Sequence, residues 1–124
     1  MKKSIPFETV GPNQFIYFDI KRLMRLEQLL GKSISNIIAT HDITISFLVN
    51  ALMVGLSHHS KDNAAQWTEK VEEFFDAGGS IDDIGVPVIQ AIVASGIFGK
   101  IEADEEKKAG EEKNVPETAK ESTV

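Results

Sequence analysis

The chain has no cysteine, one tryptophan and one tyrosine among its 124 residues. The lack of cysteine excludes disulfides, thiolate metal ligands and cysteine nucleophiles, and it fits a reducing cytoplasm. No apolar run reaches the roughly 18 residues of a membrane-spanning helix, so we expect no transmembrane segment. The basic start, Met1-Lys2-Lys3-Ser4, is not followed by the apolar core of a signal peptide. We therefore expect a protein of the cytoplasm with no membrane partner.

Acidic residues outnumber basic ones, 19 to 13, which gives a formal net charge of −6. Such a chain lacks the basic face that phosphate binding needs, so nucleic acid is not an expected partner. Residues 101–124 contain four Lys and eight Asp/Glu, and only three large aliphatic side chains. That is too little apolar surface to offset the entropy of ordering. The sequence thus predicts one folded domain over 1–100 and a disordered acidic tail over 101–124.

Turn and periodicity signals predict a mostly α fold, α+β by strict count. Alternating β-formers over 5–10 and 14–19 flank the turn sequence Gly11-Pro12-Asn13, which predicts a β-hairpin. A helix then begins after Asp19, a plausible N-cap, and ends at Gly31, which suits the left-handed C-terminal position. The remaining segments, a turn or helical turn and then three helices, are expected over 33–39, 45–57, 64–77 and 84–97. Ser80 and Asp83 resemble a capping box at the start of the last helix, with Asp82 and Asp83 in its first turn. The expected fold is a hairpin followed by a compact bundle of about four helices.

The helix that ends at Gly31 has one apolar arc and one basic face. The arc contains Ile20, Leu23, Met24, Leu26 and Leu30. Glu27 falls near the middle of this arc, where an unpaired carboxylate would be costly. We expect Glu27 to be structural, either accepting hydrogen bonds from the start of a neighbouring helix or pairing with a basic side chain; the alternative is that its face is a protein interface. The cluster of Lys21, Arg22 and Arg25 is interpreted as a solvated face, or as a docking site for an acidic segment.

The helix expected over 45–57 is apolar on two sides. Such a helix is either central in the fold or covered by a partner. Its second stripe, Phe47, Ala51 and Val54, is the expected protein-binding surface if a partner covers it. The helix over 64–77 has a single apolar stripe instead, in which Trp67 and Phe74 are expected to be structural.

Candidate catalytic residues form no known constellation. His58 and His59 are adjacent, so on a helix they point about 100° apart and cannot chelate one ion as an i, i+4 pair would. A site that adds His41, Asp42 or Asp62 would have to be assembled in space. The chain has neither a nucleophile elbow nor a glycine-rich phosphate loop. We expect no enzyme, no metal and no cofactor, with a small enzyme or metal protein that uses His41, Asp42, His58 or His59 as an alternative.

The predicted first helix and its flanks carry a characteristic series of residues: Phe18-Asp19-Ile20-(x2)-Leu23-(x2)-Leu26-Glu27-(x2)-Leu30-Gly31-Lys32-Ser33-Ile34. This series resembles the start of the tail assembly chaperones of long-tailed bacteriophages, and it is similar to tail-tube-associated proteins of gene transfer agents. In those families a short β segment leads into a helix that carries Leu-Glu and closes at Gly. Their later helices correspond here to 43–58, 67–77 and 84–98, so the resemblance covers about residues 15–99.

The resemblance implies a non-enzymatic chaperone that holds the tape-measure protein and helps the major tail-tube protein polymerise around it. Members of these families act in the infected bacterial cell and are generally absent from the finished virion. A structural tail component, such as a tail-tube or connector subunit, is the alternative from another class. The oligomeric state stays open, a homo-oligomer included.

Overall fold

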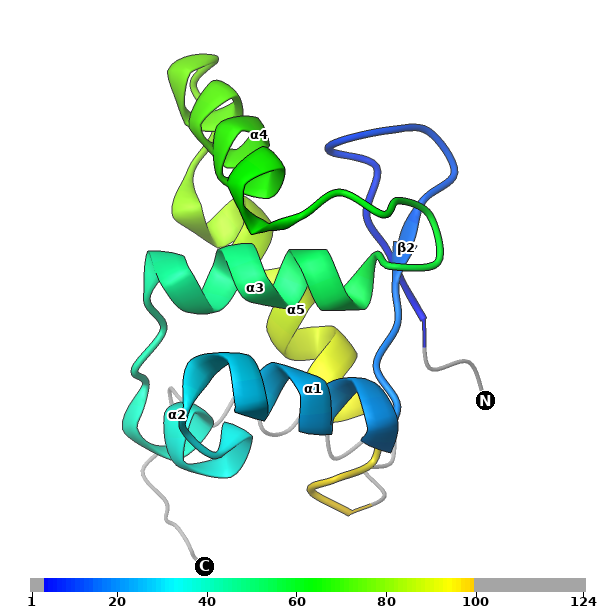
Figure 1. Ribbon diagram of the computed structural model, residues 1–124, viewed down its shortest axis with the longest axis vertical. Coiled ribbons are helices and arrows are strands. Elements are labelled where there is room, and N and C mark those ends of the chain that lie inside the picture. Colours follow the sequence, from blue (N-terminus) through cyan, green and yellow to red (C-terminus); the bar gives the residue numbers. More distant parts are fainter. Residues whose placement is uncertain (1–3, 100–124) are drawn as a thin grey trace, which may run out of the picture.

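A computed structural model describes residues 4–99, which form a two-stranded hairpin and five helices (Figure 1). The strands are β1 (Ile5–Pro6) and β2 (Phe15–Ile16). The helices are α1 (Ile20–Leu30), α2 (Ile34–Thr40), α3 (Ile45–Gly55), α4 (Ala64–Asp76) and α5 (Ile81–Ala94). The predicted mostly helical class with an N-terminal hairpin is confirmed, and of the turn or helical turn expected over 33–39 the helical alternative is present, as α2. The tail predicted over 101–124 lies outside the described residues.

The hairpin is shorter than the predicted strands. Its antiparallel register places Ile5 opposite Ile16 and Pro6 opposite Phe15. One further bond joins the amide of Phe7 to the carbonyl of Gln14, at 2.9 Å. Beyond this point the chain forms a loop rather than a ladder, because Asn13 is left-handed (φ 61°) and donates its amide to the Glu8 carboxylate. Strand pairing therefore ends well before residue 10.

Each helix begins with a side chain that satisfies a free backbone amide. Asp19, Ser33 and Thr44 accept such bonds at the starts of α1, α2 and α3. Asn63 and Ser80 form complete capping boxes at the starts of α4 and α5. The box at Ser80, which the sequence indicated, starts α5 at Ile81, and Pro87 lies inside the helix. Because each cap is formed by residues within one turn of the helix start, these helix starts follow from the local sequence.

Helix α3 is the centre of the fold, with α1, α4 and α5 packed around it (Figure 1). Its side chains are buried from Phe47 to Gly55 except at Asn50. Phe47 is 1% exposed, and Ala51 and Val54 are fully buried. The expectation that these three residues form an exposed protein-binding stripe is therefore wrong. The sequence left two explanations for a helix that is apolar on two sides, a central position in the fold or a covering partner. The central position applies, because the chain itself covers both sides of α3.

Candidate functional site

Arg22 is part of the folded framework rather than of a free basic cluster. Its Nη1 donates to the carbonyl oxygens of Tyr17 at 3.0 Å and Gly55 at 3.4 Å. The guanidinium also lies over the Tyr17 ring, 5.1 Å from its centroid. These contacts join α1 to the hairpin and to the end of α3. Lys21 and Arg25 are exposed, so only these two residues of the predicted basic cluster are available to a partner.

Two histidines after α3 pack on the same side of the hairpin as Arg22. The Phe15 ring lies 4.5 Å from the ring of His58 and 4.8 Å from that of His59. Nε2 of His59 accepts a hydrogen bond from the Phe15 amide at 3.1 Å. Nδ1 of His58 lies 2.9 Å from Nη1 of Arg22, which fits a neutral ring accepting at Nδ1. Both imidazoles thereby hold the loop that follows α3 against β2 and α1.

The residues considered for a metal site make separate contacts. Asp42 pairs with Lys32 at 2.9 Å, and Asp62 pairs with Lys70, whose hydrogen bond lowers the pKa of the Asp62 carboxyl. Within residues 4–99, no three His, Asp or Glu side chains gather in a way that could hold a metal ion. The structure thus does not bring His41, Asp42, Asp62 and the two adjacent histidines into one site.

The His58 contacts predict a loss of stability in acid. Burial, followed by the charges of His59 and Arg22, lowers the pKa of His58 below its usual 6.5. The unfolded chain therefore takes up a proton at this position before the folded chain does, so stability falls as the pH drops below about 6.5. We expect the melting temperature to decrease between pH 7.5 and 5.5, and His58→Asn, which keeps an acceptor, to reduce that decrease. The exposed His41 outside this cluster provides the control His41→Asn; an equal effect of both substitutions would contradict the assignment.

Glu27 has a structural role that the sequence suggested. Its Oε2 accepts a hydrogen bond from the amide of Ile34, the first residue of α2, at 2.9 Å. Of the two structural interpretations, the hydrogen bond to the start of a neighbouring helix is the one present. Gly31, at φ 70°, closes α1 in the predicted left-handed conformation. Trp67 is buried and Phe74 is half-buried against the core.

One apolar surface that stays open lies on α5. One side of this helix is buried, through Ile84, Val88, Ala91 and Ile92. Aliphatic residues are nevertheless exposed along the helix: Val86 is 52% exposed and Ile81, in the first turn, is 42% exposed. A groove of about 410 Å³ runs along this helix, and we call it the α5 groove; its lining residues are Ile43, Ile81, Asp82, Gly85, Val86, Ile89 and Gln90. Five of these seven residues have no polar side chain, so the groove suits an apolar occupant.

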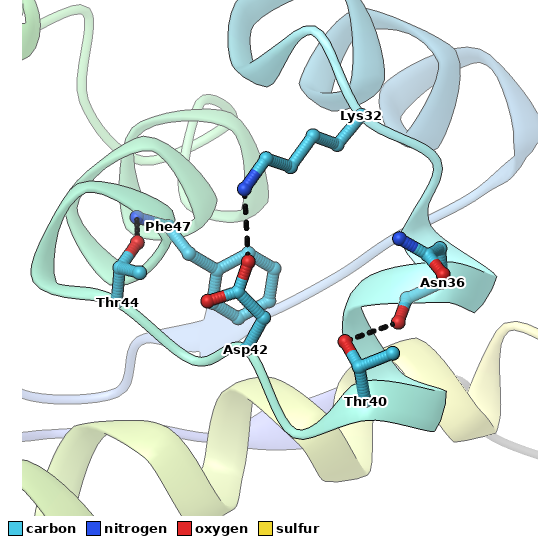
Figure 2. Close-up of polar contacts among 6 residues, drawn as sticks. All are labelled: Lys32, Asn36, Thr40, Asp42, Thr44 and Phe47. Atoms are coloured by element: carbon cyan, nitrogen blue, oxygen red, sulfur yellow. Dashed lines mark hydrogen bonds and ion pairs between the residues drawn. The ribbon is translucent and has the colours of Figure 1, made fainter.

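The link between α2 and α3 holds one wall of the α5 groove. Figure 2 shows the polar contacts of this link, where Lys32 reaches Asp42 and the Thr44 hydroxyl accepts from the amide of Phe47 at 3.0 Å. The amide of Asp42 also donates to the Ile37 carbonyl at 3.0 Å. Ile43 lies between Asp42 and Thr44, so these contacts fix the backbone on both sides of it. The groove is therefore a preformed feature with Ile43 as its wall.

A second apolar surface lies on α1, and the charged residues beside it are basic, whereas the charged residue of the α5 groove is acidic. Ile20 is 61% exposed and Met24 is 55% exposed, although both were expected in the buried arc. At about 100° per residue that arc is about 160° wide, which is more than one neighbouring helix can cover. Leu23 and Leu26 face α3, while Ile20 and Met24 remain at its edge beside Lys21 and Arg25. By contrast, the α5 groove contains Asp82, and no Lys or Arg occurs between Lys70 and Lys100.

A comparison of the chain with protein-family models, with curated proteins and with solved structures finds no match. None of the helices in residues 4–99 is long and apolar enough to cross a membrane. The groove on α5 was missed in the sequence, although its signal was present; on α1 the basic residues Lys21 and Arg25 were candidates, whereas Ile20 and Met24 were expected in the buried arc. Val86 and Ile89 lie outside the stripe formed by Ile84 and Val88, which makes α5 a second helix with two apolar sides.

Proposed function

We propose that this protein is a non-enzymatic tail assembly chaperone of a bacteriophage or prophage. It would bind the tape-measure protein in the cytoplasm of the host, and would assist polymerisation of the major tail-tube protein around it. The observation that carries the proposal is the α5 groove, a preformed apolar surface on a domain whose other aliphatic residues are largely in the core. The resemblance of residues 18–34 to these chaperones supplies the identity of the partner.

The chemistry of the groove suits one face of an amphipathic helix. A docked helix places apolar side chains at i, i+3 or i+4 spacing into a groove of this kind. Ile43 and Ile89 offer aliphatic contacts to such side chains, and Asp82 favours a Lys or Arg next to them. In the families resembled the tape-measure protein is long and helical, so it could offer helix faces of this kind. A chaperone that covers such faces in the α5 groove would delay their aggregation.

Val86→Asp is expected to weaken binding of the tape-measure protein encoded in the same gene cluster by at least about tenfold, which corresponds to about 1.4 kcal/mol. The reason is that a carboxylate in the middle of the apolar groove must be desolvated, and it adds to the charge of Asp82. Co-purification and calorimetric titration measure the effect. Leu29→Asp provides the matched control, because Leu29 is 47% exposed on α1 and does not line the groove.

Two further observations test the proposal as a whole. The gene is expected between the tail-tube and tape-measure genes, and a neighbourhood without any tail module would contradict a role in tail assembly. Mass spectrometry of purified particles is expected to find no stoichiometric amount of this protein. Its presence there would favour the alternative, a structural tail component.

A further inference from the structure

The basic and apolar surface of α1 forms a compact unit, which we call the α1 face. It consists of Ile20, Met24, Lys21 and Arg25, all exposed. Ile20 and Met24 are four residues apart, so their side chains lie about 5–6 Å apart along one ridge of the helix. The only acidic residue within α1 is Glu27, which already accepts the amide of Ile34. The α1 face therefore presents two apolar side chains together with two cations that make no ion pair with any of residues 4–99.

The α5 groove has the complementary properties. Its lining is mostly aliphatic, and Asp82 provides a carboxylate near the start of α5. Asp83 adds a second negative charge in the same helical turn, although its side chain bonds the Ser80 amide. With no Lys or Arg from residue 71 to residue 99, nothing in this part of the sequence neutralises that charge. An apolar ridge flanked by cations is the occupant that such a groove favours.

We propose that the α1 face of one copy of this protein docks into the α5 groove of a second copy. Ile20 and Met24 occupy the apolar length of the groove, and Lys21 or Arg25 pairs with Asp82. The proposal concerns the same groove as the proposed function but rests on a different observation, the charge complementarity of two surfaces of one chain. It therefore stands whether or not the partner protein is a tape-measure protein.

The contact joins two different surfaces, so a series of copies linked by it is head-to-tail. Both α1 and α5 pack on α3, with α5 passing behind α3 in the view of Figure 1. Each contact uses the α1 face of one copy and the groove of the next, which leaves a free groove at one end and a free α1 face at the other. Such a heterologous interface closes into a ring or continues as a filament. A client helix and a second copy would compete for each groove.

Sedimentation of the purified full chain tests the inference, with two variants that each remove one half of the contact. Lys21→Glu/Arg25→Glu reverses the α1 face and keeps the groove, whereas Val86→Asp spoils the groove and keeps the α1 face. The wild-type protein is expected to self-associate with rising concentration, and less so in about 0.5 M salt, where charges are screened. Each variant alone is expected to self-associate at least about tenfold more weakly.

The mixture of the two variants is the decisive sample. It contains one intact groove and one intact α1 face, so it should form a one-to-one dimer and nothing larger. Val86→Asn replaces Val86→Asp if the latter does not keep the wild-type melting temperature. A monomeric wild type, unchanged self-association of Lys21→Glu/Arg25→Glu, or a mixture without dimers would each overturn the inference.

The same variants separate this inference from the proposed function. Lys21→Glu/Arg25→Glu is expected to bind the tape-measure protein at least as tightly as the wild type, because its groove is intact and no second copy competes for it. If the wild type is monomeric and this variant still binds the tape-measure protein, the groove takes a client alone and self-association is refuted. If the wild type self-associates but does not bind the tape-measure protein, the proposed function fails and the head-to-tail contact stands.

Discussion

Val54→Asp is expected to unfold the domain, whereas Val86→Asp is expected to leave it folded. Val54 is fully buried in α3, and Val86 is 52% exposed on α5. Burying an unpaired carboxylate costs about 4 kcal/mol or more in a core without partners for it, and small domains have only about 5–15 kcal/mol of stability. At Val86 the new carboxylate stays in water, so the free energy of unfolding should change by only about 0.5 kcal/mol.

Thermal and urea denaturation followed by circular dichroism measure this contrast. Val54→Asp should lack a cooperative transition or melt far below the wild type, and Val86→Asp should melt within about 4 °C of it. A folded Val54→Asp variant would place the Phe47, Ala51 and Val54 stripe on the surface, as a partner-binding helix requires. An unfolded Val86→Asp variant would show instead that the α5 groove is closed in solution.

The local part of this fold follows from the sequence, because its signals act over a few residues. Residues within one helical turn predict a helix end at Asp19, Ser80 and Gly31, and all three are helix caps in the structure. The hydrogen bond between Glu27 and the amide of Ile34 spans seven residues. This bond could be predicted because a carboxylate in an apolar arc needs a hydrogen-bond donor, and the start of a helix offers free amides. Local chemistry therefore determines both the helix boundaries and the hydrogen bond that joins α1 to α2.

The candidate surfaces could not be predicted in the same way, since exposure depends on which elements cover a helix. Both α3 and α5 are apolar on two sides, and periodicity does not state which of them is central. Arg22 shows the same limit, because two of its partners, Gly55 and His58, are 33 and 36 residues away in sequence. In the sequence Arg22 groups with the basic residues Lys21 and Arg25, whereas in the fold its hydrogen bond to Gly55 joins α1 to α3. Packing between distant segments decided these assignments.

Two helical glycines offer a second large contrast in stability, because the space beside them differs. A Cβ at Gly55 would lie 2.7 Å from Cγ2 of Ile16 and 3.1 Å from Cζ of Phe18, both fully buried. A Cβ at Gly85 would have Cδ2 of Leu48, at 4.0 Å, as its nearest neighbour. Alanine gains at most about 1 kcal/mol of helix propensity over glycine at either position. Only at Gly55 does overpacking, at about 1–3 kcal/mol, oppose this gain.

Gly55→Ala is therefore expected to lower the urea midpoint, and Gly85→Ala to raise it. The close approach at Gly55 is what lets the Tyr17 amide donate to the Gly55 carbonyl at 3.0 Å, so the added methyl also strains the joint between the hairpin and α3. Each variant serves as the control for the other, since the chemical change is identical and both positions are helical. Stabilisation by Gly55→Ala would mean that Ile16 and Phe18 yield without cost, and that the hairpin is held to α3 mainly by Arg22 rather than by close packing.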